Sequence, residues 1–125
     1  MITLPWPPSA NKLWRNVNGR TIKSETYRKW LMLAGWDLRS QKPKPVPGPY
    51  RLTMIAIRPD QRRRDIDNLL KPVSDLLRDC GVIEDDSLAQ SVMAGWSLES
   101  PVRDGQIIVA VEPFTEPLQL LGKAA

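Results

Sequence analysis

The sequence of 125 residues contains no histidine and a single cysteine, Cys80. Without histidine there is no Ser-His-Asp triad, no imidazole general base and no metal site with an imidazole ligand. One cysteine forms neither an internal disulfide nor a cysteine-rich zinc cluster. If the protein is an enzyme, its acids, bases and metal ligands must therefore be carboxylates, lysines, hydroxyls or metal-bound water.

Long hydrophobic runs are also missing from the chain. No segment approaches the roughly 20 apolar residues that a membrane span needs. Three prolines interrupt the first ten residues, which is unlike a signal peptide. Both features predict a soluble, cytoplasmic protein without a membrane partner. With 42% hydrophobic residues the chain can bury a core, so we expect a single domain over residues 1–125, with residues 113–125 as a peripheral tail.

Positive charge is concentrated in the first part of the chain. The net charge is +4 at pH 7, but residues 1–48 carry nine lysines and arginines against two acids, whereas residues 82–125 carry two against seven. A basic segment of this kind is typical of a protein that binds nucleic acid, although a solvated basic surface gives the same pattern. The acidic C-terminal part argues against non-specific coating of DNA.

The pattern of apolar residues predicts strands and helices in alternation. Residues 9–23 indicate a basic loop or a hairpin, because Asn18-Gly19 is a turn signal, and the proline-rich residues 42–49 indicate an extended connector. This order favours a compact α/β (α+β) fold with a mixed sheet and two main helices. The predicted strands are 2–6, 52–57, 88–97 and 106–112, the last of them central, and the predicted helices are 24–38 and 67–80.

Each predicted helix has an apolar face. Ser24 is suited to cap the first helix, and Trp30 and Trp36 are both assigned to the core. In the second helix Gly81 is the natural residue after the C-cap, whereas Pro72 predicts either a distorted first turn or a start nearer residue 69. The predicted buried stripes are Tyr27, Trp30, Leu31, Ala34 and Leu38 in the first helix and Leu69, Val73, Leu76, Leu77 and Cys80 in the second.

The densest group of candidate catalytic side chains lies at the start of the second helix. Asp65 and Asp67 stand two residues apart, and in an extended segment such residues point to the same side. Two converging carboxylates repel unless a cation lies between them, and a hard divalent ion such as Mg²⁺ prefers oxygen ligands. The acidic run 84–86 supplies candidates for a third ligand, although spacing alone does not bring it close.

Positive side chains surround this acidic pair. Lys71 follows Asp67 by four residues on the same helical face, where its ammonium group is suited to stabilising charge on a reacting phosphate. Arg62, Arg63 and Arg64 precede the acids and are suited to binding phosphates bidentately. Arginines that bind a phosphate beside carboxylates that hold a metal describe a metal-dependent phosphodiesterase.

Structural roles explain the same residues without catalysis. Asp67 is then a helix N-cap, which contributes about 1 kcal/mol, and Asp65 is an ion-pair partner of a neighbouring arginine. The acids of residues 84–86 are then a solvated turn, and Lys71 is a surface partner one helical turn from Asp67. Spacing and composition leave both interpretations open.

Three blocks of the sequence resemble the RusA family of Holliday-junction resolvases. Residues 2–11 (ITLPWPPSAN), with the following loop through Thr21, are similar to the family's opening strand and proline turn. Residues 63–71 (RRDIDNLLK) resemble its central motif, and residues 82–86 (VIEDD) resemble its second acidic block. The D-x-D-N-x-x-K motif with a downstream D-D is fairly specific as a combination, whereas each half alone is weak.

The resemblance implies a Mg²⁺-dependent endonuclease that resolves four-way DNA junctions, with Mn²⁺ as a substitute ion. By motif position, its metal-binding and catalytic carboxylates fall on Asp65, Asp67 and Asp86. Asp85 is the alternative to Asp86, because a slip of one residue satisfies the same motif. The catalytic lysine falls on Lys71.

The resemblance also implies binding to branched DNA as a homodimer. Paired cuts in a junction with approximate two-fold symmetry favour one active site in each subunit of a dimer. The alternatives are a Mg²⁺-dependent nuclease acting on other branched or flap DNA, and a non-catalytic basic module that binds nucleic acid. The residues expected to contact DNA are Lys12, Arg15, Arg20, Arg62, Arg63, Arg64 and Asn68.

Overall fold

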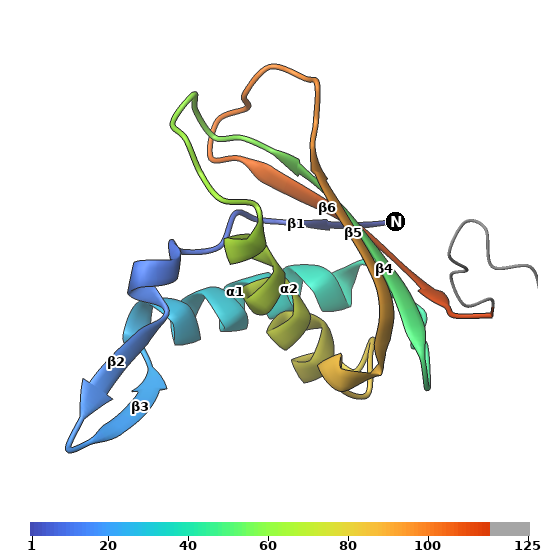
Figure 1. The fold of residues 1–125 in the computed structure, drawn as a ribbon, viewed down its shortest axis with the longest axis horizontal. Helices are drawn as coiled ribbons and strands as arrows, with labels where there is room; N and C mark the ends of the chain where they lie inside the picture. The colour runs from blue at the N-terminus through green and yellow to red at the C-terminus, as the bar shows by residue number, and fades with distance from the viewer. Residues whose placement is uncertain (116–125) are drawn as a thin grey trace, which may run out of the picture.

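A four-stranded mixed sheet forms one layer of the structure, a computed structural model in which residues 1–115 are described (Figure 1). The strand order is β1-β6-β4-β5. Strands β1 (Ile2–Leu4) and β4 (Tyr50–Ile57) are antiparallel to β6 (Gln106–Pro113), and β5 (Ala89–Trp96) is parallel to β4. Strand β6 is therefore interior, as its apolar run predicted. Because β4 and β5 are parallel, the chain must cross over between them, and helix α2 (Asp67–Asp79) lies in that crossover.

Two helices cover one face of the sheet, which confirms the predicted α+β class (Figure 1). Helix α1 (Glu25–Ser40) begins after Ser24, whose side-chain oxygen accepts a hydrogen bond from the Tyr27 amide at 3.0 Å. The predicted cap is therefore present. Apolar side chains of both helices meet the inner faces of the strands in one core, which includes Leu4, Tyr27, Ala34, Leu38, Leu52, Met54, Val73, Leu76, Leu77 and Val109.

Helix α2 ends in a Schellman motif. The Val82 amide donates to the Leu77 carbonyl at 2.9 Å, and the Gly81 amide donates to the Arg78 carbonyl at 3.0 Å. This closure requires a left-handed residue after the C-cap, and Gly81 has φ +76°. The predicted role of this glycine is confirmed, and the motif directs the chain toward β5.

The first turn of α2 is distorted, as Pro72 predicted. The Leu69 amide donates to the Ile66 carbonyl at 3.0 Å, a bond that spans three residues instead of four. Pro72 itself has no amide hydrogen for the carbonyl of Asn68. The helix nevertheless begins at Asp67, so the alternative of a start near residue 69 is wrong.

A hairpin projects from the body between β1 and α1 (Figure 1). A short 3₁₀ turn, η1 (Ala10–Lys12), leads into strands β2 (Trp14–Val17) and β3 (Arg20–Lys23), which pair antiparallel. The turn residues Asn18 and Gly19 have φ +51° and +76°, as a two-residue hairpin turn needs. Of the two structures expected for residues 9–23, the hairpin is correct.

Three sequence expectations fail in detail. Strand β1 ends at Leu4 rather than Trp6, because Pro5 and the prolines after Trp6 cannot continue a ladder. Trp36 is 61% exposed rather than buried, since six residues after the buried Trp30 an α-helix has turned to a direction about 120° away from it. Strand β6 extends to Pro113, so the expected tail begins later, and residues 116–125 lie outside the described residues. Within residues 1–115, no helix has the length and apolar character of a membrane span.

Gly105 and Gly81 provide a matched pair of positions that tests how tightly Trp6 packs beside the start of β6. Both have positive φ, +69° and +76°, but a Cβ on Gly105 would lie 2.8 Å from a ring carbon of Trp6, whereas Gly81 faces open space. We expect Gly81→Ala to lower the free energy of unfolding by about 1 kcal/mol through backbone strain. Gly105→Ala should cost about 2–4 kcal/mol because overpacking adds to that strain. Equal losses in urea unfolding would contradict the tight Trp6 contact.

Candidate active site

Three of the predicted site residues line one shallow pocket of about 330 Å³, between α2 and the starts of β4 and β5. Asp67 and Lys71 come from α2, and Asp86 comes from the 3₁₀ turn η2 (Asp86–Leu88) that precedes β5. Because β4 and β5 are parallel, the chain between them must return to the end of the sheet where β4 begins. Helix α2 lies in this return, and η2, which follows it, contacts α2. The crossover therefore brings the second acidic block to the first.

Lys71 lies between two carboxylates. Its Nζ is 3.1 Å from Oδ1 of Asp75 and 3.6 Å from Oδ2 of Asp86. The close contact with Asp75 raises the pKa of Lys71 against the lowering effect of burial, and the charges of Asp75 and Asp86 raise it further, so the ammonium form is favoured. Among residues 1–115 it makes no ion pair with Asp67, the partner expected one turn earlier.

Asp75 is the one buried charged side chain in residues 1–115, with 1% of its surface exposed. The Tyr27 hydroxyl donates to Asp75 Oδ2 at 2.5 Å, and Arg78 Nη2 lies 3.5 Å from Oδ1. Sequence analysis missed this residue. Position 75 lies off the predicted apolar stripe of α2, so the periodicity gave no signal of its burial, and only its place one helical turn after Lys71 was visible in the sequence.

Asp85 and Asp86 have different local roles. The Asp85 side chain caps η2 by accepting hydrogen bonds from the amide of Ser87, at 3.0 Å, and from its hydroxyl. These bonds to Ser87 lower the pKa of Asp85. Asp86 is the residue that lines the pocket and faces Lys71. The geometry therefore favours Asp86 over Asp85 as the acid of the site.

Asp67 does not cap α2. Ile66 occupies the N-cap position and forms no side-chain cap, and Asp67 is the first helical residue. The structural explanation of Asp67 as an N-cap is therefore wrong, although a negative charge in the first turn remains favourable. Its carboxylate makes no ion pair within residues 1–115 and lines the pocket instead.

Asp65 lies apart from Asp67. It lines a neighbouring pocket of about 690 Å³ together with Arg63, Arg64 and Asn68, which is bounded on the other side by the proline turn after β1. The expectation that the two aspartates point to the same side assumed an extended segment. Ile66 instead has helical angles, φ −63° and ψ −29°, and in a helical segment residues i and i+2 diverge.

The acidic side chains of these two pockets do not form a complete metal site. Residues 1–115 contain no group of three or more acidic, cysteine or histidine side chains arranged to hold a metal ion. Asp67 and Asp86 share one pocket, and Asp65 lies in the next. Two carboxylates in one pocket still suit Mg²⁺, which is commonly held by one or two carboxylates with phosphate oxygens and waters.

The arginines before α2 are anchored by another acid. Asp60 forms ion pairs with Arg64, at 2.8 Å, and with Arg62, at 3.8 Å. The hydrogen bond from Arg64 lowers the pKa of Asp60 to about 2. The alternative in which Asp65 pairs with these arginines is therefore wrong. The Arg64 guanidinium also lies 5.7 Å from the ring centre of Trp6.

Trp6 belongs to an aromatic stack that sequence analysis did not predict. Its ring stacks on Trp96 with centroids 6.1 Å apart, and the Arg58 guanidinium lies 4.1 Å from the Trp96 ring. These contacts join the end of β5 to the proline turn and to the loop between β4 and α2. Arg64 is thereby held beside the pocket that contains Asp65.

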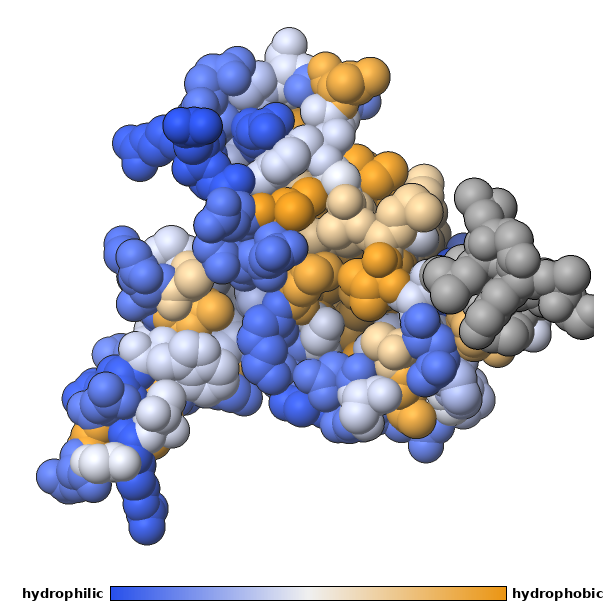
Figure 2. Space-filling model, viewed as in Figure 1, coloured by the Kyte–Doolittle hydropathy of each residue, from blue (hydrophilic) through white to orange (hydrophobic). Residues whose placement is uncertain are grey.

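Lys12 lies in η1, and Arg15 and Arg20 lie on the exposed hairpin, which is mainly hydrophilic (Figure 2). Hydrophilic side chains also cover the loop between β4 and α2, on the same side of the molecule in this view (Figures 1 and 2). Residues 58–66 of that loop carry the three consecutive arginines. The predicted basic residues therefore lie in or beside two projections on one side of the body.

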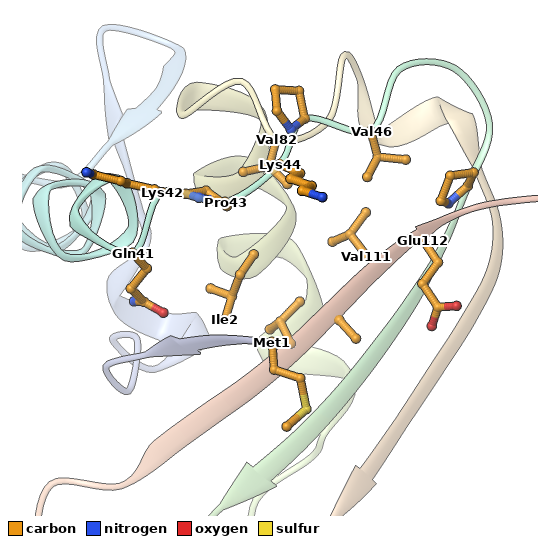
Figure 3. A pocket seen from close by; sticks show the side chains of 14 residues that line it. Met1, Ile2, Gln41, Lys42, Pro43, Lys44, Val46, Val82, Val111 and Glu112 are labelled. Carbon is orange, nitrogen blue, oxygen red and sulfur yellow. The ribbon is translucent and has the colours of Figure 1, made fainter.

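A further pocket of about 530 Å³ lies between the connector 42–49 and strands β1 and β6 (Figure 3). Its walls are mostly apolar, including Val46, Val82 and Val111, and Lys42 and Lys44 come from the connector. Glu112 is its one acidic residue. No pair of carboxylates gathers there, so it is not a competing metal site.

A pocket with two carboxylates and a lysine, in a molecule that carries basic projections, is typical of phosphodiesterases that use a divalent metal. The family model of endodeoxyribonuclease RusA matches residues 5–112, which include the whole pocket. The chain therefore belongs to the RusA family.

Several curated relatives support this assignment. The crossover junction endodeoxyribonuclease RusA of Aquifex aeolicus is 32% identical over 111 residues, 88% of this chain and 86% of the relative. The enzyme of the same name from Escherichia coli K12 is 36% identical over 93 residues, 69% of this chain and 72% of the relative. A third, from Enterobacteria phage 82, is 37% identical over 91 residues.

Proposed function

We propose that this protein is a crossover junction endodeoxyribonuclease that hydrolyses phosphodiester bonds in four-way DNA junctions during recombination and repair. The observation that carries the proposal is the meeting of Asp67, Lys71 and Asp86 in one pocket of a RusA-family chain. Asp67 is not the helix cap, and Lys71 and Asp86 face each other across the pocket, so all three side chains are directed to one site.

Mg²⁺ is the proposed cofactor, with Mn²⁺ as a substitute, because both ions accept the oxygen ligands that this pocket offers. Asp67 and Asp86 are its proposed ligands, because both line one pocket. Asp65 is proposed to join them from the neighbouring pocket when DNA is bound. The ion, when bound, offsets phosphate charge and lowers the pKa of a water molecule.

The remaining chemistry belongs to the chain. Lys71 keeps an ammonium group at the pocket wall, where it stabilises the negative charge that develops on the phosphate. In-line attack by water leaves 5′-phosphate and 3′-hydroxyl ends. Arg63, Arg64 and Asn68 line the adjoining pocket and are proposed to hold the neighbouring phosphates of the same strand.

A homodimer is proposed because a junction with approximate two-fold symmetry requires paired cuts, and residues 1–115 contain one such carboxylate pocket. Sedimentation equilibrium tests this by mass, and a monomer that stays monomeric on the junction would contradict it. We also propose that residues 1–125 act as one endonuclease domain in the cytoplasm.

Cleavage of synthetic junctions tests the site. Asp67→Asn and Asp86→Asn should each lower the cleavage rate at least about 100-fold, while junction binding stays equal or strengthens because a negative charge near phosphate is removed. EDTA should abolish cleavage by the unchanged protein, and Mg²⁺ should restore it. The rates are measured on four-way junction, fork and duplex DNA.

Two variants sharpen this test. Asp79→Asn removes an exposed acid at the end of α2 and should cut normally, and Asp85→Asn should cut far better than Asp86→Asn because Asp85 only caps η2.

If Asp67→Asn cuts normally, the site is wrongly assigned. Faster cutting of forks than of junctions would favour a different branched substrate. Junction binding without cutting would indicate a binding module.

The salt dependence of junction binding tests the hairpin. Each phosphate contact contributes about 0.9 to the slope of log K against log salt. Arg15→Gln combined with Arg20→Gln should therefore reduce this slope by about two and weaken binding similarly for all sequences. The matched control is Lys42→Gln combined with Lys44→Gln in the connector, which should leave the slope unchanged. Equal effects of both pairs would mean that net charge, not the hairpin, governs binding.

A further inference from the structure

We propose that Asp75 is a positioning residue for hydrolysis, which holds the Lys71 ammonium at the pocket wall and limits its pairing with Asp86. This inference rests on the proposed function, because it assumes that Lys71 and Asp86 act in the reaction. It adds a residue outside the D-x-D-N-x-x-K and D-D motifs. Asp75 does not line the pocket, so it acts only through Lys71.

Burial makes Asp75 difficult to explain as a stabilising residue. Its side chain is 1% exposed on the inner face of α2, beside the fully buried Leu76. Removing a carboxylate from water is costly, and an apolar residue of similar size at such a position is often neutral or stabilising. A buried charge at this position therefore calls for a role in the site that it contacts.

The orientation of the Asp75 carboxylate is fixed from the other helix. Tyr27 of α1 donates its hydroxyl to Oδ2 at 2.5 Å, which leaves Oδ1 directed to Lys71 and Arg78. The Tyr27 ring is fully buried and packs against Trp30 and Trp14, with centroids 6.3 and 5.7 Å away. Burial, and then the hydrogen bond to Asp75, raise the pKa of Tyr27, so the hydroxyl remains a donor.

The consequence for Lys71 follows from its two distances. Its Nζ lies closer to Asp75, at 3.1 Å, than to Asp86, at 3.6 Å. A lysine side chain has four rotatable bonds and loses rotamer entropy when it is fixed, so it needs a partner to stay in one position. Without Asp75 the ammonium would be free to swing or to pair fully with Asp86, where it would compete with a cation. Asp75 thus keeps Lys71 available for the phosphate and Asp86 available for the metal.

Single-turnover cleavage of a pre-bound four-way junction tests the inference. Asp75→Asn should lower the cleavage rate about 10- to 100-fold, as expected for a misplaced catalytic group, with junction affinity within about threefold. In a Lys71→Ala background, followed for as long as its residual rate requires, Asp75→Asn should cause no further loss. A purely structural role would instead lower the rate by the same factor in both backgrounds, and that result would overturn the proposal.

Binding of Mn²⁺, measured by calorimetry without DNA, provides a readout independent of cleavage. Asp75→Asn should weaken Mn²⁺ affinity roughly threefold because the released ammonium pairs with Asp86. Adding Lys71→Ala should restore the affinity. If Mn²⁺ affinity and the cleavage rate of folded Asp75→Asn both match the unchanged protein, Asp75 positions nothing and the proposal fails.

Two further variants control for folding and charge. Asp79→Asn removes an acid from the same helix and should change neither readout. If Asp75→Asn does not fold, Tyr27→Phe provides the test with both charges intact. It should lower cleavage less than tenfold in the wild-type background and not at all beside Lys71→Ala, and equal losses in both would overturn the proposal. If the unchanged protein cuts no branched DNA, the proposed function itself fails, an outcome that the wild-type measurement reveals separately.

Discussion

The packing of α2 against the parallel strands β4 and β5 is the constraint on which the whole site depends. Its buried face, which includes Leu69, Val73 and Leu76, fixes the rotation of the helix about its axis. Asp67 and Lys71, one turn apart, then line the pocket beside the sheet. The hydrophobic effect does not by itself orient a helix, but the spacing of the apolar residues along α2 determines which side of the helix is buried.

The parallel arrangement of β4 and β5 is equally important. Parallel strands begin at the same end of the sheet, so the chain must travel back along α2 before β5 starts. The Schellman motif at Gly81 ends the helix, and η2 then places Asp86 against Lys71. Residues that are distant in sequence meet because of strand direction, not because of any attraction between them.

Local sequence rules succeed where the relevant interactions are local. The Ser24 cap, the Asn18-Gly19 turn and the Gly81 closure follow from backbone geometry that these residue types favour, and all three are present. The same rules fail where a tertiary or conformational choice intervenes. Asp65 and Asp67 diverge because Ile66 is already helical, and Trp36 is exposed because only one side of α1 meets the core.

Asp75 illustrates a different limit of sequence reasoning. Position 75 lies off the apolar stripe of α2, so its burial is an exception that the sequence does not announce, and the sequence does not name its partners. Tyr27 lies on another helix, and only the packing of α1 against α2 brings its hydroxyl to the carboxylate. Buried charge requires such partners, so the exception becomes interpretable once the two helices are placed.

By itself, the sequence determined the order of the elements, the mixed α+β class, the absence of histidine chemistry and the motif that places the chain in its family. These properties depend on residue type, periodicity and short spacing. Only the tertiary structure decided that Asp86 rather than Asp85 faces Lys71, that Asp65 lies in a separate pocket, and that Asp75 holds the lysine. The physical reason is that these relations join residues across a helix and a parallel crossover, where direction and rotation are set by packing of the whole core.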